Sequence, residues 1–427
     1  MSKKLLIQSY KFPPVHIVGA QRLFHFYHFL SPYFSEIKVL TTENQRRFIK
    51  DESLFIHSAA VEMLATNDLR TWLLNKGRKG AYLDDKSKES VKNISFATFY
   101  HSFPFVYFTG DGGYTYMRKS YKRAVKLIEE EGITHILSSY RPWADHIVCY
   151  RLKKKFPHLI WIADFRDLAI DPVRKDIWWP RLQRYYQRRL LKKSDIVTTV
   201  SDGLAKRLKP FVSKEIAVVR NGLARLPAGF MTAPISSKFI ISYTGSLYPK
   251  LQSAELLFQC IRTLLNEGLI NITHLELQYA GKDGALWEQW TTKYSLTHLS
   301  SNLGLVSLGE AKKLQANCQI NLLLSWSAKD YGGIMTAKLA DYLYAGRPII
   351  ALLNGPADPE FNQLVEATAG GKVYPSQEPD SPEQLRTFLL DAYRTWQFSG
   401  ALPWQIDSTK LQPYTWIEQV KKLIEKM

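Results

Sequence analysis

Short apolar runs alternate with amphipathic stretches along most of the chain. Strands are predicted at residues 5–9, 37–41, 135–138, 159–163, 239–244, 275–280, 303–306, 320–324, 349–353 and 372–374, and most of these segments are short apolar runs typical of buried parallel strands. Between many of them the apolar spacing becomes helical, as at 20–30, 116–131 and 382–395. This repeated alternation of strand and helix predicts an α/β protein made of doubly wound sheets.

The length of 427 residues predicts two or three domains. A stretch rich in Pro, Gly and Ser, Leu223 to Ser237, is typical of a linker. We therefore expect an N-terminal domain at 1–225, a C-terminal domain at 226–404, and a final segment at 405–427 that ends in an amphipathic helix.

The most informative segment runs from Tyr331 to Leu353. A glycine-bearing loop leads into a helix at Thr336, which ends before Pro348 and a buried strand. A helix N-terminus offers unpaired N–H groups, Lys338 adds a positive charge, and Asp341 adds a hydrogen-bond acceptor. This set would suit a diphosphate beside a sugar or ribose hydroxyl. The alternative is an ordinary helix–strand unit with a surface lysine and aspartate.

A second candidate lies at the carboxyl end of the strand predicted at 159–163. Asp164, Arg166 and Asp167 follow it directly, where doubly wound folds place their ligands. Arg141, which begins a predicted helix, is a further candidate beside the same edge. The alternative for the acids and Arg166 is an ion pair that holds loops together.

Charge is divided unevenly along the chain. Residues 1–225 hold 40 Lys and Arg against 21 Asp and Glu, a net +19, whereas residues 226–427 carry −1. The first half is therefore expected to face an anionic partner: lipid headgroups, a phosphate-bearing acceptor or nucleic acid. The helix predicted at 180–193 adds to this, with six cations outward and Leu182, Tyr186, Leu190 and Leu191 inward. Such a helix could hold the protein to a bilayer, or it could be merely solvated.

Other features narrow the class of protein. The three cysteines fit no metal or redox spacing, which favours a reduced cytoplasm. The N-terminus is too short in apolar residues for a signal peptide, and no run approaches the ~18 apolar residues of a membrane-spanning helix. The chain contains no GxGxxG, so a dinucleotide site is not indicated.

The run Lys338-Leu339-Ala340-Asp341-Tyr342-Leu343, followed by Ala345-Gly346-Arg347-Pro348-Ile349, resembles the donor-binding segment of family 4 glycosyltransferases of the GT-B fold. Further matches keep the family's order: Phe12-Pro13-Pro14 with Gly19 and Gln21-Arg22, Asp164-Phe165-Arg166-Asp167, Asn221-Gly222, and Tyr243 to Tyr248. Two positions depart from the pattern. Asp341 replaces the family's Glu, and Gly333 stands where many members have another Glu.

The resemblance implies the GT-B fold: two doubly wound Rossmann-like domains facing a central cleft, with the C-terminal helix returning to the first. It implies a retaining transfer of sugar from a nucleotide-diphosphate donor to a saccharide or lipid-linked acceptor in cell-surface polysaccharide synthesis, without metal or cofactor. The expected location is the cytoplasm, peripheral to the inner membrane face. The implied donor-binding residues are Gly19, Gly245, Ser246, Lys250, Ser307, Leu308, Thr336, Lys338, Leu339 and Asp341; the catalytic candidates are Asp164, Arg166 and Asp167; Arg22 and Arg141 are acceptor-side candidates.

Two other functions are considered beside this one. A pseudo-enzyme would keep the fold and bind nucleotide sugars without transfer, as the glycine at Gly333 suggests. A nucleic-acid-binding protein would account for the basic half. We disfavour it because the chain carries no RNA- or DNA-binding motif.

Overall fold

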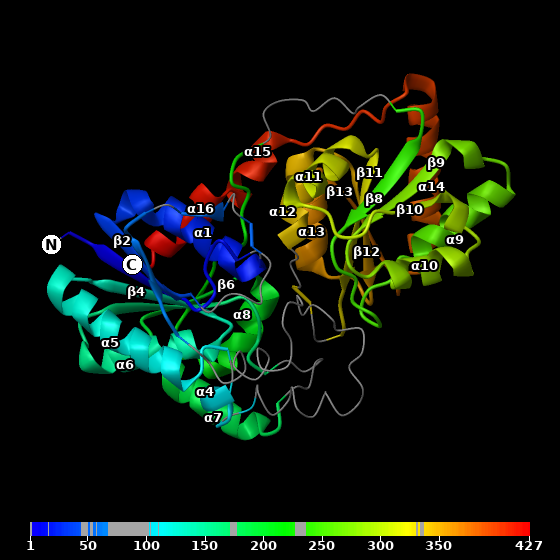
Figure 1. The fold of residues 1–427 in the computed structure, drawn as a ribbon. Coiled ribbons are helices and arrows are strands. Elements are labelled where there is room, and N and C mark those ends of the chain that lie inside the picture. The colour runs from blue at the N-terminus through cyan, green and yellow to red at the C-terminus, as the bar shows by residue number, and fades with distance from the viewer. Residues whose placement is uncertain are drawn as a thin grey trace, which may run out of the picture. The chain divides into compact units, whose positions relative to one another are not determined.

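The computed structural model describes residues 2–15, 17–43, 50–51, 54–56, 58–66, 102, 104–109, 111–170, 177–226, 236–329, 332–333 and 337–427. The chain divides into two compact units, which are described one at a time. The N-terminal unit comprises residues 1–221 and 416–427, and the C-terminal unit comprises residues 222–415. Each is built around one parallel sheet (Figure 1). Residues 227–235 of the predicted linker lie outside the described residues.

The described part of the N-terminal unit contains a seven-stranded sheet in the order β3-β2-β1-β4-β5-β6-β7. Its strands are β1 (Lys4–Gln8), β2 (Glu36–Thr42), β3 (Val61–Leu64), β4 (His135–Tyr140), β5 (Ile160–Phe165), β6 (Ile196–Thr199) and β7 (Ile216–Val218). Its helices are α1 (Val18–Leu30), α4 (Val106–Thr109), α5 (Tyr114–Glu131), α6 (Trp143–Lys155), α7 (Pro180–Leu191), α8 (Asp202–Leu208) and α16 (Trp416–Ile424), with 3₁₀ turns η1 (Ser31–Tyr33) and η3 (Lys209–Phe211).

Strand order places the candidate residues of this unit at one edge. The order reverses between β1 and β4, and all the pairings are parallel. The loop after β1 and the ends of β4 and β5 therefore meet at the carboxyl edge of the sheet, beside the point where the chain turns in opposite directions.

The C-terminal helix α16 completes the core of the N-terminal unit. Trp416 stacks on His25 of α1 with ring centroids 4.9 Å apart, and Val420 and Leu423 are fully buried. The Gln419 side-chain oxygen accepts a hydrogen bond from the Arg220 backbone N–H at 2.7 Å. The predicted amphipathic helix is thus confirmed, and its apolar face packs against the other end of the chain.

The described part of the C-terminal unit contains a six-stranded sheet in the order β10-β9-β8-β11-β12-β13. Its strands are β8 (Phe239–Thr244), β9 (Leu275–Ala280), β10 (Ser300–Asn302), β11 (Ile320–Trp326), β12 (Ile349–Asn354) and β13 (Gly371–Pro375). The helices are α9 (Glu255–Asn266), α10 (Gly284–Lys293), α11 (Leu308–Asn317), α12 (Ala337–Ala345), α13 (Pro359–Ala367), α14 (Ser381–Ser399) and α15 (Ser408–Leu411), with 3₁₀ turns η4 (Ile272–His274), η5 (Thr297–Leu299) and η6 (Gln412–Tyr414).

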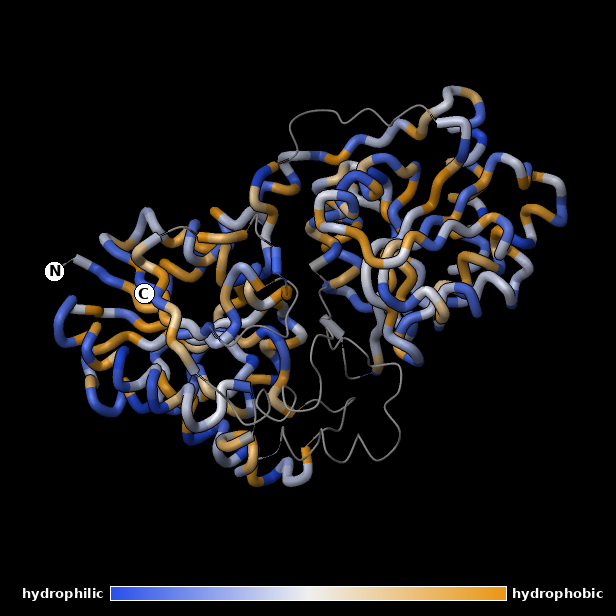
Figure 2. Tube along the Cα trace, viewed as in Figure 1, coloured by the Kyte–Doolittle hydropathy of each residue, from blue (hydrophilic) through white to orange (hydrophobic). Residues whose placement is uncertain are grey.

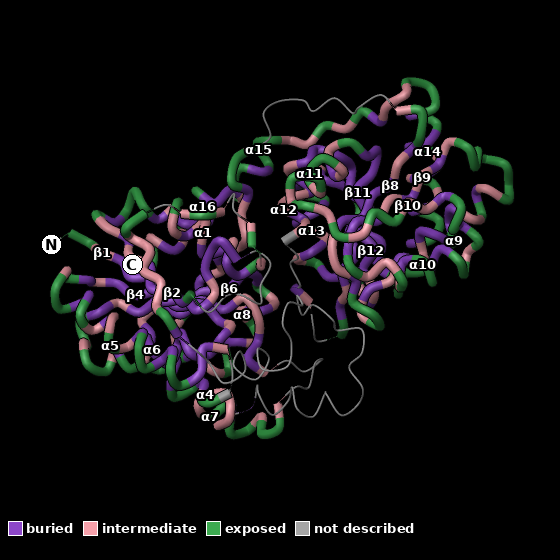
Figure 3. Tube along the Cα trace, in the orientation of Figure 1, coloured by how far each residue is buried: buried purple, intermediate pink, exposed green. Residues whose placement is uncertain are grey.

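Strand β12 explains why the apolar runs are continuous rather than alternating. Ile350 and Leu352 pack into one hydrophobic cluster, whereas Ile349, Ala351 and Leu353 pack into another on the opposite face. Because side chains alternate across a strand, a sheet covered by helices on both faces needs apolar residues at every position. Hydrophobic residues accordingly follow the strands of both sheets (Figure 2), and most of the strand residues are buried (Figure 3).

The orientation predicted for the basic helix is wrong in part. Leu182 was expected to face inward but is 40% exposed, while Gln183 and Gln187 are buried. Tyr186 is half-buried, and Leu190 and Leu191 are buried as predicted. The buried stripe at 183, 187, 190 and 191 keeps helical spacing, and the methylenes of the two glutamines fill the inward positions in place of Leu182. It packs toward α4 and α6, whose Val106, Trp143 and Ile147 line the same small cavity.

The strand predicted at 303–306 is also wrong. The observed strand β10 lies just before it and is formed by Ser300, Ser301 and Asn302, which pair with β9. Leu303 and Leu305 are 45% and 67% exposed. β10 lies at the edge of the sheet, so its position is determined by backbone hydrogen bonding to β9 and not by burial of apolar side chains. In the part of the chain that the structure describes, no helix combines the length and apolar character required to cross a membrane.

Candidate functional site

In the N-terminal unit, Asp164 lies at the end of β5 with every side of its carboxylate occupied. Strand register places Ser139 of β4 and Thr198 of β6 on either side of it, and both hydroxyls donate to it at 2.7 Å. Arg22 Nη2 donates at 2.8 Å. Burial by itself would raise the pKa of Asp164, but Arg22 and the two hydroxyls lower it below the usual carboxyl value.

Arg22 is as deeply buried as its partner. Its guanidinium also donates to the Asn221 side-chain oxygen at 3.0 Å and lies 4.6 Å above the Phe26 ring. The Arg22–Asp164 pair therefore joins α1 and β5 to the end of the unit's first segment. A direct contact of either residue with a substrate stays a prediction, because both side chains are enclosed by protein.

Arg166 is half-buried and contacts the Arg22–Asp164 pair's neighbour Ser139. Its Nε donates to Ser139 Oγ at 3.2 Å, and its Nη2 donates to the Arg141 carbonyl at 3.5 Å. The guanidinium lies across Gly19 so closely that a Cβ there would be 2.1 Å from Nη1. Residue 19 must therefore be glycine for this arrangement. The start of α1, the end of β4, the residue Arg141 and the loop after β5 thus meet at the carboxyl edge of the sheet. Burial lowers the pKa of the Arg166 guanidinium, and the half-buried carboxylate of Asp167 only partly opposes this.

In the C-terminal unit, the turn after β8 is shaped to admit a lysine. Gly245 has φ +120°, and its N–H donates to the Ala280 carbonyl at 2.7 Å. A Cβ at Gly245 would lie 2.5 Å from Cε of Lys338. The side chain of Lys338, from the first turn of α12, therefore crosses directly over the Gly245–Ser246 turn at the carboxyl end of β8.

The Lys338 ammonium is held by neutral groups. It donates to the hydroxyl of Tyr243 and, at 3.3 Å, to the Ser246 carbonyl, and it lies 4.1 Å from the centre of the Tyr243 ring. Burial lowers the pKa of Lys338 to about 7, and the more distant Asp283 carboxylate only partly opposes this. A cation held in this way gains from an anionic ligand that reaches the same turn.

An aromatic stack supports this lysine. The Tyr243 and Tyr279 rings lie 6.0 Å apart and nearly parallel, and Trp287 stacks on Tyr279 at 5.3 Å. The Tyr279 hydroxyl donates to the Gly245 carbonyl at 3.2 Å, and Asp283 accepts from the Leu247 N–H at 2.8 Å. The sequence does not indicate these supporting roles, since within an apolar strand Tyr243 or Tyr279 cannot be told from a core residue, and Asp283 is one acid among many in a loop.

The remaining residues of α12 have different surroundings. Leu339 is buried in the hydrophobic cluster on one face of the sheet. Asp341 is half-buried, and burial raises its pKa to about 6. Tyr342 ties the helix to β8, because its hydroxyl accepts from the Thr244 N–H at 3.2 Å. Thr336 lies outside the described residues.

The other predicted donor residues lie in two loops. Ser307 caps α11: its hydroxyl accepts from the Glu310 N–H at 3.2 Å, and the Glu310 carboxylate accepts from the Ser307 N–H at 2.9 Å. Leu308 is the first residue of that helix. Lys250 is exposed in a turn with φ +65°, and Lys338, not Lys250, approaches the Gly245 turn in the described residues.

Asp358 contacts the loop that precedes α12, a role that the sequence does not indicate. Its carboxylate caps α13 by accepting from the Glu360 N–H at 3.1 Å, and it also accepts from the Gly333 N–H. It thereby anchors part of the glycine loop before α12. A carboxylate thus contacts the backbone of Gly333.

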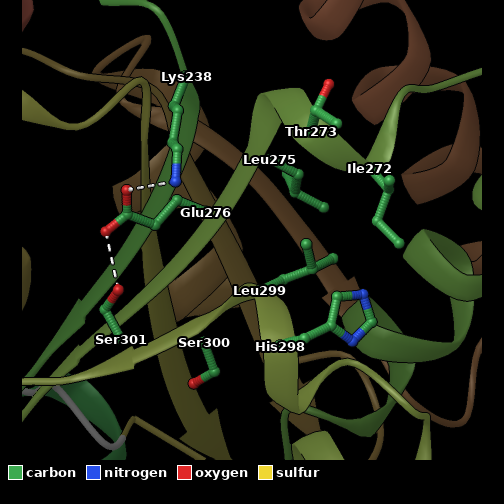
Figure 4. A pocket seen from close by; sticks show the side chains of 9 residues that line it. All are labelled: Lys238, Ile272, Thr273, Leu275, Glu276, His298, Leu299, Ser300 and Ser301. Carbon is green, nitrogen blue, oxygen red and sulfur yellow. Dashed lines mark hydrogen bonds and ion pairs between the residues drawn. The ribbon is translucent and has the colours of Figure 1, made fainter.

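A separate pocket lies at the opposite end of the C-terminal sheet (Figure 4). It is lined by residues at the amino ends of β8, β9 and β10, including Lys238, Glu276 and Ser301. Ser301 Oγ donates to Glu276 at 2.9 Å, and Lys238 lies 3.8 Å from the same carboxylate. Because doubly wound folds bind ligands at the carboxyl ends of strands, this pocket is not the candidate site.

The described residues form two parallel sheets of seven and six strands covered by helices, and solved structures with the GT-B fold match the chain over nearly its full length, which confirms the predicted fold class. Neither a family model nor a curated protein matches the sequence. Solved structures do. Sucrose-phosphate synthase from Thermosynechococcus elongatus has a TM-score of 0.61 at 12% identity, with 99% of this chain and 98% of that chain covered.

Two further structures span nearly the whole chain. The lipopolysaccharide outer core galactosyltransferase WaaB has a TM-score of 0.58 at 11% identity, covering 99% of this chain and 98% of that chain. A UDP-N-acetylglucosamine 2-epimerase has a TM-score of 0.53 at 11% identity, covering 100% and 95%. At such identities the similarity shows the fold alone, and membership of family 4 stays a prediction.

Proposed function

We propose that the protein is a glycosyltransferase that takes a sugar from a nucleotide-diphosphate donor. The observation that carries the proposal is the approach of the Lys338 ammonium to the Gly245–Ser246 turn at the carboxyl edge of the C-terminal sheet. Its present partners are a tyrosine hydroxyl and a carbonyl, which leave its charge uncompensated. A diphosphate would supply the compensating negative charge, and Asp341 on the same helix would accept hydrogen bonds from ribose hydroxyls.

The reaction consistent with this site breaks the bond between the sugar's anomeric carbon and the diphosphate oxygen. The acceptor oxygen forms the new bond to that carbon, the nucleoside diphosphate leaves with the bonding electron pair, and the acceptor's proton passes to the departing diphosphate. Negative charge grows on the diphosphate as the bond breaks, so a cation placed there stabilises the transition state more than the ground state. We propose that the anomeric configuration is retained, as the sequence resemblance implies.

The acceptor belongs to the N-terminal unit in this proposal. Arg166 and Arg141 lie at the carboxyl edge of its sheet, beside Gly19, and suit an acceptor that carries hydroxyl or phosphate groups. A saccharide or lipid-linked acceptor in cell-surface polysaccharide synthesis fits both this edge and the basic first half of the chain. The protein would then work at the cytoplasmic side of a membrane.

The test begins with calorimetric titration of UDP, GDP, ADP and CDP into the intact protein. One of them should bind, and Lys338→Ala should weaken its binding by about tenfold or more. Lys372→Ala is the matched control, since Lys372 also lies over an aromatic ring, at 5.9 Å from that of Phe388, but on β13. If no nucleotide binds, or if both variants bind like the wild type, the donor site is not here.

Binding is followed by turnover of the sugar derivative of the nucleotide that binds. Transfer releases a nucleoside diphosphate and forms a glycoside, whose anomeric configuration can be read by proton NMR. Epimerisation would instead change the sugar and leave it on the nucleotide, and this outcome is relevant because an epimerase shares the fold. A pseudo-enzyme would bind nucleotide and return the sugar unchanged with every acceptor.

A further inference from the structure

The outer face of α7 combines exposed aromatic and cationic side chains. Trp178 and Trp179 precede the helix and are 44% and 45% exposed, and Leu182 and Tyr185 on its first turns are 40% and 56% exposed. Arg181, Arg184, Arg188 and Arg189 are exposed on the same helix. We call these eight residues the α7 surface. It is a surface of the N-terminal unit alone.

The apolar part of this surface is ordered by neighbouring residues. The Phe105 ring lies 5.9 Å from the Trp179 ring and 6.4 Å from the Trp178 ring. Together with Pro104, Pro180 and Leu182, the two tryptophans line an open hollow. Two neighbouring tryptophans and a leucine that are all more than a third exposed form a contiguous apolar patch, which a merely solvated helix does not need.

The cationic part lies along the adjacent strip of the helix. Positions 181, 184 and 188 recur at helical spacing, and Leu182 and Tyr185 stand next to them on the side of the tryptophans. Arg188 is held in place by the Pro210 carbonyl at 3.1 Å and by the Phe211 ring. The α7 surface therefore presents aromatic rings beside a row of arginines, while its buried side, Gln183, Gln187, Leu190 and Leu191, is anchored to the unit.

We infer that the α7 surface docks the protein on a bilayer that contains anionic lipid. Tryptophan and tyrosine settle at the boundary between headgroups and acyl chains, and arginine pairs with lipid phosphates. Charge complementarity favours this partner, because the α7 surface carries four exposed arginines and no acidic residue, in the half of the chain that has a net +19. The biological purpose of this docking, which is to bring a lipid-linked acceptor within reach, rests on the proposed function. The docking itself does not depend on it.

The test is co-sedimentation of the intact protein with vesicles. One set consists of phosphatidylcholine, and the other of equal parts phosphatidylcholine and phosphatidylglycerol. The wild type should bind the anionic vesicles, and binding should fall as salt is added. Arg181→Ala with Arg184→Ala should weaken this binding by about 30-fold, since each cation at an anionic surface is worth about fivefold. Trp178→Ala with Trp179→Ala should weaken it by about tenfold or more.

The control removes the same charge elsewhere in the unit. Lys122→Ala with Lys126→Ala takes two exposed cations from α5 and should change vesicle binding by no more than about twofold. All variants alter exposed side chains, so their unfolding curves should match the wild type. Nucleotide titration of the same variants keeps this test separate from that of the proposed function, because each result can fail while the other holds.

Three results would overturn the inference. One is equal binding to neutral and anionic vesicles, or none to either. Another is a wild-type dimer in sedimentation velocity that both paired α7 variants abolish while vesicle binding stays intact, which would make a second copy of the chain the occupant. The last is DNA or RNA binding that depends steeply on salt and is lost in the arginine variant, with vesicle binding unchanged.

Discussion

Replacement of Asp164 by alanine tests whether this residue serves stability or chemistry. The change would leave the Arg22 guanidinium buried beside the Asn221 oxygen and the rings of Phe26 and Trp416, with no carboxylate to compensate its charge among these contacts. It would also remove the acceptor of the Ser139 and Thr198 hydroxyls. Breaking a buried ion pair from one side costs about 3–5 kcal/mol, and two stranded hydroxyls add to that. We expect Asp164→Ala to destabilise the N-terminal unit by about 4 kcal/mol or more.

The assay is urea unfolding of the intact chain followed by circular dichroism, with the transition of each unit fitted separately. Asp167→Ala is the matched control, because this neighbouring carboxylate is half-buried and its removal should cost no more than about 1 kcal/mol. A wild-type unfolding curve for Asp164→Ala, together with lost sugar transfer, would refute the reasoning. It would mean that Asp164 acts on the substrate and that its hydrogen bonds from Ser139, Thr198 and Arg22 are incidental.

The same pair predicts a pH dependence with a definite sign. The folded pKa of Asp164 is below its ordinary value, so the stabilisation is complete above the unfolded pKa of 3.8 and is lost as pH falls through the folded one. Wild-type stability should therefore decline in acid, and the part of that decline that Asp164→Ala abolishes is the contribution of this carboxylate.

Three further predictions concern the C-terminal unit. Because the pKa of unliganded Lys338 is about 7 and a diphosphate binds its charged form, nucleotide affinity should fall by up to tenfold per pH unit above 7; a pH series in which Lys338→Ala shows the same slope would contradict this. Gly245→Ala should abolish nucleotide binding by displacing Lys338, whereas Gly268→Ala, also at positive φ but in open space, should cost only ~1 kcal/mol of stability in thermal unfolding. Asp358→Ala should cost ~1 kcal/mol as a lost helix cap and also weaken nucleotide binding by releasing Gly333, whereas Asp407→Ala, which removes the cap of α15, should leave titrations unchanged.

The sequence predicted much of the fold because its local patterns agree with the tertiary structure. The run 349–353 is apolar at every position, and the structure buries it on both faces as the pattern requires. The failures occur where the pattern carries no such constraint. β10 is an edge strand made of serine and asparagine, and α7 buries glutamines, so in both places backbone pairing or packing outweighs hydrophobicity.

The candidate site divides in the same way. The position of Asp164 and Arg166 at a strand end follows from sequence, since the carboxyl ends of parallel strands share an edge. The pairing of Asp164 with Arg22 does not follow, because the two residues are 142 positions apart and their side chains meet only once α1 packs on the sheet. Similarly, Lys338 was recognisable as a cation near a helix start, but its contact with Tyr243 depends on how α12 crosses β8.

The two clusters differ in how their charge is satisfied, and this difference separates support from binding. Arg22 and Asp164 compensate each other inside the protein, so a ligand could add little to either. Lys338 is equally constrained by Tyr243 and by the Gly245 turn, yet its direct partners are neutral and burial depresses its pKa. A protein that holds a lysine in an unfavourable electrostatic environment loses stability whenever that lysine is charged. An anion at the turn would reverse the penalty, and that gain is the free energy available for binding and stabilising a departing diphosphate.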